Sequence, residues 1–130
     1  RPRTRFVADF MGFGNLFEGT VSECSSAGSM VAVSQMHIAI RAPTPIGTRL
    51  ALALRAERIE ILRADEPLAQ ARGQVAQIVY QGGVSALVVQ LDRAQEFRLL
   101  VRTPARGFVI GDRVALRWRI DDVCVLQDDS

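Results

Sequence analysis

The chain contains no lysine, because all 16 of its basic residues are arginine. This absence excludes every site that depends on a lysine side chain, including the P-loop GxxxxGK[ST], the strand lysine of protein kinases and Schiff-base nucleophiles. A net charge of only +2 also argues against a dedicated nucleic-acid binder, unless arginines cluster on one face.

Histidine and cysteine are nearly as scarce. No CxxC or HExxH motif is present, so we expect no zinc site. His37 stands between two apolar residues in a strand-like stretch, where a packed or half-exposed role is expected in place of a catalytic one. Cys24 and Cys124 lie far apart in the sequence. An oxidising compartment would let them pair, but without a secretion signal we expect buried free thiols.

Long apolar runs are also missing. The most apolar stretch, 30–40, is interrupted by Ser34, Gln35 and His37, and is shorter than the ~18 residues of a membrane span. Asp9 breaks the apolar run that follows the basic N-terminal residues, which argues against a signal peptide. Hydrophobic residues at 48% and charged residues at 23% are typical of a globular protein with a core. The first residue is Arg1, and we expect the chain to be part of a longer protein.

The residues that are present alternate between apolar and polar over short stretches. The first half predicts strands at 15–24, 29–41, 49–55 and 58–62, separated by a Pro/Gly loop at 42–47. In 49–55 we expect Leu50, Leu52 and Leu54 on one face. Residues 5–11 have helical spacing and predict a short N-terminal helix.

The second half gives a stronger strand signal. Residues 73–92 predict a hairpin with its turn at Gln81-Gly82-Gly83, followed by strands at 96–102, 112–120 and 121–126. In 112–120 the pattern places Val114, Leu116, Trp118 and Ile120 inward and Arg113, Arg117 and Arg119 outward. About eight to ten short strands predict an all-β fold, a small barrel or sandwich. We find no repeat of the roughly 34-residue kind.

Gly12, Gly14 and Gly19 follow the expected helix and raise the question of a phosphate-binding turn. The dinucleotide motif GxGxxG would need glycine at position 17, which is Phe17. The element order is also reversed, with a helix before a strand. We therefore expect no phosphate site. Gly12 suits the end of a helix, and Gly19 a bulge or a close approach between strands.

Acidic pairs occur at 65–66, 121–122 and 128–129, all in expected connections or at the end of the sequence. Neighbouring carboxylates on a strand point to opposite faces, so none of these pairs suits acid–base catalysis. We therefore expect no catalytic residue, no cofactor and no metal site in this chain.

Four segments together resemble the C-terminal transport-associated OB (TOBE) domain of ABC-transporter ATP-binding subunits. The segments are FVADFMGFGNLFEGTV (6–21), LALRAERIEIL (52–62), GQVAQIVYQGGVSALVVQLD (73–92) and LVRTPARGFVIGDRVALRWRIDDVCVL (100–126). The first is most similar to polyamine-type importers, with ferric-iron and sugar importers as relatives. Two departures from the family pattern are Ala56, where the pattern has proline, and Ala86-Leu87, where it often has an aromatic residue.

The resemblance implies a domain organisation and a function. Residues 1–12 would be the helical tail of a preceding ATPase domain, and 13–127 the TOBE, OB-like β domain. The chain would be a non-catalytic regulatory or dimerisation domain, while ATP and Mg²⁺ would bind elsewhere in the parent subunit. Expected partners are a second copy, the ATPase domain of the same polypeptide and transmembrane permease subunits, with no nucleic acid. The expected location is cytoplasmic, at the inner face of the cell membrane.

Six residues are candidates for interface or regulatory roles. Phe6, Phe10 and Met11 would form an apolar stripe that a neighbouring copy or the β domain covers. The resemblance adds three positions that match its motifs: Asn15, Arg55 and Glu57. For Arg55 and Glu57 it implies a local turn or an inter-subunit contact, and a structural ion pair is an equal alternative.

A stand-alone OB-type domain remains the alternative. It would bind either a small oxyanion, through backbone amides with Thr20, Ser25 or Ser26, or single-stranded nucleic acid, through Arg113, Arg117 and Arg119. Aromatic residues make up only 6% of the chain, which gives little material for base stacking.

Overall fold

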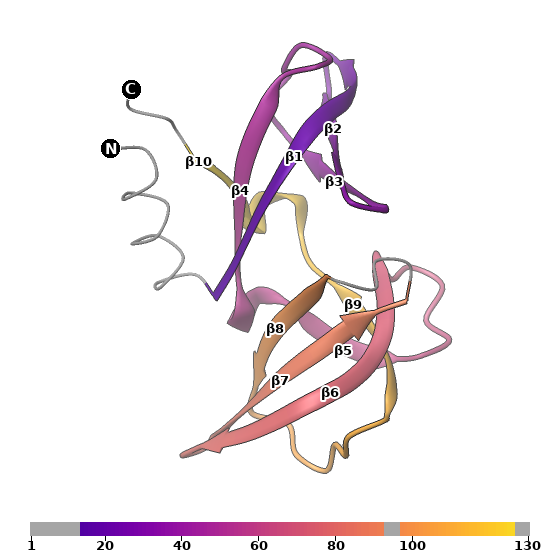
Figure 1. Ribbon diagram of the computed structural model, residues 1–130, viewed down its shortest axis with the longest axis vertical. Helices are drawn as coiled ribbons and strands as arrows, with labels where there is room; N and C mark the ends of the chain where they lie inside the picture. The colour runs from indigo at the N-terminus through magenta and orange to yellow at the C-terminus, as the bar shows by residue number, and fades with distance from the viewer. Residues whose placement is uncertain (1–13, 93–96, 127–130) are drawn as a thin grey trace. The chain divides into compact units, whose positions relative to one another are not determined.

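The computed structural model describes residues 14–92 and 97–126, and the regular secondary structure of these residues is almost entirely β-strand (Figure 1). The all-β prediction is confirmed; the predicted N-terminal helix at 5–11 lies outside the described residues. The strands are β1 (Gly14–Ser25), β2 (Gly28–Val33), β3 (Met36–Ile40), β4 (Arg49–Arg55), β5 (Glu60–Arg63), β6 (Ala71–Gln81), β7 (Val84–Leu91), β8 (Arg98–Thr103), β9 (Arg113–Arg117) and β10 (Val123–Leu126). Two single 3-10 turns, η1 (Ala56–Arg58) and η2 (Ile120–Asp122), complete the described elements.

The strands form two five-stranded antiparallel sheets, one in each of two compact units, and not one closed barrel. The first unit is built from residues up to Arg55 and from Arg119 onward, and the second unit is Ala56–Trp118. The N-terminal boundary predicted for the β domain, after residue 12, lies outside the described residues.

In the first unit the strand order is β10-β4-β1-β2-β3. The unbroken pairing of β4 with β1 keeps Leu50, Leu52 and Leu54 on one face, as predicted, and Ala51 and Ala53 on the other face are buried as well. Both faces of this central strand are covered, so polar alternation is not required there.

Gly19 in β1 marks a close approach between strands, as the sequence predicts. A Cβ at this position would collide with the carbonyl oxygen of Ala32 and with Val33 on β2. The irregularity in pairing follows directly, between Val21 and Glu23. A bulge at this point turns the long strand, which increases its twist.

In the second unit the order is β5-β9-β6-β7-β8, and the predicted hairpin is confirmed as β6 and β7. Gly73 approaches Gln90 on β7 as closely as Gly19 approaches β2. The strand predicted at 112–120 is shorter in the structure: β9 ends at Arg117, and Ile120 lies in η2 of the first unit. Trp118 follows β9 and is buried, as predicted.

The two sheets share one topology. In each, a three-strand meander (β1-β2-β3 or β6-β7-β8) is followed by a strand that pairs with the first strand of the meander, namely β4 or β9. The fifth strand is exchanged: β5 follows β4 along the chain but pairs with β9, and β10 follows β9 but pairs with β4. The chain is therefore a tandem repeat of β1–β5 and β6–β10. The last strand of each repeat pairs in the sheet of the other repeat.

The sequences of the repeats agree once this pairing is known. IGTRLALALRAERIEIL (46–62) aligns without a gap with IGDRVALRWRIDDVCVL (110–126). The identical positions are Ile46/Ile110, Gly47/Gly111, Arg49/Arg113, Ala51/Ala115, Leu52/Leu116, Arg55/Arg119 and Leu62/Leu126. The two copies begin at Ile46 and Ile110, a spacing longer than the roughly 34-residue period of common repeat proteins.

Candidate functional site

The arginines expected to form an outward row are largely engaged in ion pairs. Arg113 binds the carboxylate of Asp92 through both terminal nitrogens, at 2.8 and 2.5 Å, and Arg117 donates its Nε–H to Glu60 at 3.0 Å. The hydrogen bond from Arg113 holds the pKa of Asp92 below its ordinary value. Because their charges are already compensated, these arginines form a weak phosphate-binding surface.

Arg55 and Glu57 lie where the chain first passes from one unit to the other. Arg55 ends β4, and Glu57 is exposed within η1. The next turn of chain is anchored by Ala56 and Ile59, which are 0% and 3% exposed in the second unit. Glu57 therefore lies in a local turn, as the resemblance implied, and a contact between subunits stays a prediction.

The chain returns to the first unit between Trp118 and Arg119, and both sides of this second crossing are fixed by hydrogen bonds. In the second unit the side-chain amide of Gln70 donates to the Trp118 carbonyl at 2.9 Å and accepts from the Trp118 N–H at 2.8 Å. In the first unit Asp122 accepts from the Arg119 N–H at 3.0 Å.

An ion pair also stabilises η2, the turn that follows the crossing between Trp118 and Arg119. Arg41 donates to Asp121 at 2.5 Å, and this hydrogen bond lowers the pKa of the carboxyl group. Sequence reasoning assigned 121–122 to solvated turn residues and missed Arg41 and Gln70. Nothing in the sequence identifies Arg41 as the partner of Asp121, because the two residues lie some eighty positions apart.

Asn15 was predicted as an interface or regulatory residue. It is buried in β1 and donates its side-chain N–H to the Leu54 carbonyl at 3.2 Å. A buried amide with this partner holds β1 against β4, which is a structural role. Phe6, Phe10 and Met11 lie outside the described residues, so their predicted stripe is not tested.

The first unit has an open pocket of about 250 Å³ beside the β1–β2 turn. Its lining includes Ser25, Ser29, Ala39 and Ile120. The repeat explains the pocket: the pairing places Leu87 and Leu100 of the second unit where the first has Ser29 and Ala39. Smaller side chains leave this space unfilled.

Two features of the pocket bear on oxyanion binding. Ser25 lines it as a possible donor, since its hydroxyl oxygen accepts from the Ala27 N–H at 3.2 Å and keeps its own proton, whereas the Ser29 hydroxyl already donates to the Ala42 carbonyl at 2.9 Å. The carboxylate of Glu23 is on the same lining and would repel an anion. Of the other expected donors, Thr20 is hydrogen-bonded to Arg49 at 3.0 Å, and Ser26 is exposed.

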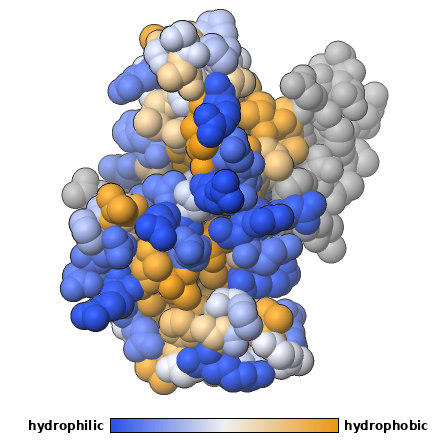
Figure 2. All heavy atoms as spheres, turned by 180° about the vertical axis from the view of Figure 1, so that it is seen from behind, coloured by the Kyte–Doolittle hydropathy of each residue, from blue (hydrophilic) through white to orange (hydrophobic). Residues whose placement is uncertain are grey.

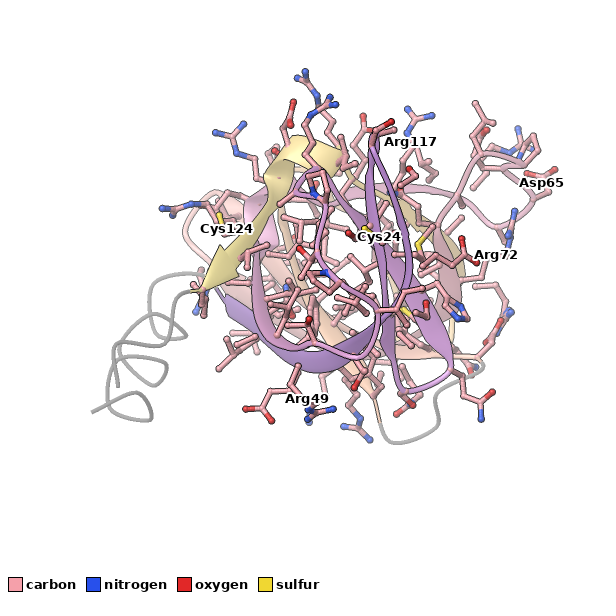
Figure 3. All side chains as sticks on the ribbon, turned by 90° about the horizontal axis from the view of Figure 1, so that it is seen from above. Cys24, Arg49, Asp65, Arg72, Arg117 and Cys124 are labelled. Carbon is pink, nitrogen blue, oxygen red and sulfur yellow. The ribbon has the colours of Figure 1, made fainter. Side chains whose placement is uncertain are left out.

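The cysteines are free, as expected, but the prediction that they are buried is wrong. Cys24 is exposed near the end of β1, and Cys124 is half-exposed on β10 (Figure 3). Both positions face solvent because β1 extends past the core here and β10 is an edge strand. His37 is exposed on β3, away from any role in the core.

Within residues 14–92 and 97–126, no group of three histidine, cysteine or acidic side chains is placed to hold a metal ion. None of the helical segments in these same residues is long and apolar enough to cross a membrane. Apolar side chains do reach the surface among hydrophilic ones (Figure 2). In the second unit the large exposed apolar residues are Leu68, Val79, Tyr80, Val109 and Ile110.

Comparison with known families matches residues 52–126 to the TOBE domain. The chain is similar to the spermidine/putrescine import ATP-binding protein PotA 2 of Pseudomonas aeruginosa, with 32% identity over 92% of this chain and 36% of that protein. It is also similar to the putrescine transport ATP-binding protein PotG of Escherichia coli, with 31% identity over 96% of this chain and 36% of the relative. The chain thus spans about a third of the length of the curated relatives that it matches.

Among solved structures, the chain is similar to the cytoplasmic molybdate-binding protein ModG, with a TM-score of 0.69. The match covers 87% of this chain and 95% of that one at 16% sequence identity. At this level of identity the similarity establishes a shared fold.

Proposed function

Because this chain belongs to the TOBE domain family, we propose that it is the C-terminal accessory domain of the ATP-binding subunit of a polyamine-type ABC importer. The observation that carries this proposal is the similarity of nearly the whole chain to PotA- and PotG-type subunits. The lysine-free sequence contains no P-loop, so ATP and Mg²⁺ would bind in the remainder of the intact subunit.

The role of the domain itself is regulatory and structural. It would help to hold two ATP-binding subunits together and to couple them to transmembrane permease subunits at the cytoplasmic face of the membrane. Arg55 and Glu57 are suited to an inter-subunit contact, because both are exposed while Leu54 and Ala56 beside them are buried. The apolar stripe of Phe6, Phe10 and Met11 would extend such a contact.

The proposal is tested with the intact subunit and its permease in proteoliposomes. We expect ATP-dependent uptake of labelled spermidine or putrescine, and weaker subunit dimerisation when the chain from Gly14 onward is deleted. A Glu57→Arg variant should lower the dimer fraction, with Glu60→Gln as a control because Glu60 is paired with Arg117. Unchanged dimerisation after the deletion would contradict the structural role. Uptake of ferric iron or sugar in place of polyamine would correct the substrate class.

A small oxyanion is a second candidate ligand, favoured by the fold that the chain shares with the molybdate-binding protein ModG. The serines of the first-unit pocket would supply donors, but Glu23 opposes an anion there. Calorimetry with molybdate, tungstate and sulfate tests whether the pocket binds an oxyanion despite Glu23. Saturable heat that Ser25→Ala removes would support this ligand, and no heat with any of the three would eliminate it.

A further inference from the structure

The two units differ in how the chain builds them. The second unit is one continuous segment, Ala56–Trp118, whereas the first is assembled from two segments that flank it. The strand β10 therefore pairs with β4 across an insertion on the order of sixty residues. The second unit is a complete module inserted into the first.

The second unit also brings its own ends together. β5 lies near its beginning and β9 near its end, and these strands pair, with Glu60 opposite Arg117. The Arg117–Glu60 ion pair at 3.0 Å bridges the same two strands. When the second unit is folded, its two ends are therefore held close together. The two segments of the first unit, which end at Arg55 and begin at Arg119, then start from neighbouring points.

If the second unit were unfolded, its residues would form a flexible loop between β4 and β10. Pairing β10 with β4 would then require that loop to close. For a loop on the order of sixty residues, the closure entropy lowers the pairing equilibrium constant by roughly a thousandfold. The β10–β4 pairing covers the edge of Ala51–Leu54, a run of four consecutive buried residues in the first sheet. Loss of that pairing would expose a strand on which the first unit depends.

We propose that the two units form a one-way folding hierarchy, in which the first unit is ordered only while the second is folded, whereas the second stays folded without the first. This inference does not depend on the proposed transport function. A partner or ligand that loosened the second unit would thereby release the first, which contains Asn15 and Arg55. The exchanged strands thus act as a conformational switch.

The hydrogen bonds at the second crossing support this direction of control. Gln70 fixes the backbone of Trp118 from within the second unit, so the exit point of the chain is set before β10 begins. Asp122 and Arg41 then order η2, which leads directly into β10.

Matched substitutions in the intact chain test the hierarchy. Leu52 on β4 and Leu116 on β9 are equivalent in the two repeats, and both are 0% exposed. Replacing either by aspartate buries an unpaired charge. Hydrogen exchange read by mass spectrometry should show that Leu52→Asp removes protection only from β1–β4 and β10. Leu116→Asp should remove it from both units.

A natural cysteine allows the closure mechanism itself to be tested. Cys124 lies opposite Ala53 in the β10–β4 pair, so Ala53→Cys offers a disulfide that closes the loop covalently. In a Leu116→Asp, Cys24→Ser background, this disulfide should restore protection to β1–β4, and reduction should remove it. If the oxidised disulfide fails to restore protection, closing the loop between β4 and β10 is not what orders the first unit.

Two other results would overturn the hierarchy. Protection that persists in the first unit of Leu116→Asp would mean that the units are independent. Loss of protection throughout Leu52→Asp would mean that neither unit is stable alone. Should a variant be insoluble, the unsubstituted chain in rising urea decides the matter. The first unit must lose protection at or below the urea concentration at which the second does, and the reverse order contradicts the proposal.

Discussion

The side chain of Gln70 forms two hydrogen bonds with the backbone of Trp118, one to its carbonyl at 2.9 Å and one from its N–H at 2.8 Å. The amide thus takes the place of a neighbouring strand just where β9 has ended at Arg117. It satisfies both polar groups of a residue whose side chain is buried, and it fixes the direction in which the chain leaves the second unit.

Removing this amide should therefore destabilise the protein. We expect Gln70→Ala to lower the free energy of unfolding by about 1 kcal/mol, because the two Trp118 backbone groups lose their partners in a partly buried site. Urea unfolding followed by the fluorescence of the single tryptophan measures the change. Gln74→Ala is the matched control. Its amide makes one exposed bond at 3.3 Å, so an equal loss there would refute the special role of Gln70.

The two glycines at the close approaches should resist substitution equally. An added Cβ at Gly19 or Gly73 would overlap the carbonyl oxygen of Ala32 or Gln90, so each alanine variant should cost about 1–3 kcal/mol. Gly83→Ala is the control, since its Cβ would meet nothing within 4 Å. Thermal unfolding of the three variants gives the comparison. A neutral Gly73→Ala would show that β6 and β7 can separate without cost.

Acid should weaken the fold through two carboxylates. Hydrogen bonds from Arg113 and Arg41 hold the folded-state pKa values of Asp92 and Asp121 below their ordinary value of 3.8. The unfolded chain therefore takes up protons first as the pH falls. The stability from these pairs is present above about pH 4 and is lost as the pH drops through the depressed folded-state values.

Denaturation between pH 2 and pH 6 measures this loss. The double variant Asp92→Asn, Asp121→Asn should be less stable at pH 6 and show a flatter dependence below pH 4. Asp65→Asn is the control, because Asp65 is exposed and lies 3.7 Å from Arg63. A double variant with the wild-type slope would disprove this assignment.

The apolar stripe predicted from the sequence should drive self-association. We expect Phe6→Ser combined with Phe10→Ser to lower the dimer fraction in sedimentation measurements, because the stripe offers apolar area for burial between copies. Exposed Val79→Ser on β6 serves as a control for general surface apolarity. A dimer fraction that is unchanged in the double variant would remove the stripe from the interface.

Local sequence signals predicted most of the strands and turns, but they did not predict which strands pair with one another. The 73–92 hairpin and the close approach at Gly19 were predictable because turn chemistry and glycine needs are local. The exchange of β5 and β10 was not, since the pattern of a strand does not say which edge it joins. The leucine face of β4 was also predictable, whereas the burial of Ala51 and Ala53 on its second face depends on the tertiary structure.

Two motifs that carry the family resemblance, 52–62 and 100–126, overlap the two copies of the internal repeat, 46–62 and 110–126. Their similarity was visible in the sequence, but it becomes persuasive only when the pairings β5–β9 and β10–β4 supply the alignment. For the site, the turn implied for Glu57 is present as η1, whereas Arg55 is the last residue of β4 and the contact between subunits stays a prediction. Gln70 and Arg41 carried no signal, because their partners are distant in sequence.

If this chain is the accessory domain of an import ATPase, the coding sequence upstream of the codon for Arg1 should show it most directly. We expect an open reading frame that encodes, in order, a P-loop with its lysine, an ABC signature and a Walker B strand. A start codon within a few residues of Arg1, with none of these motifs in frame, would contradict it.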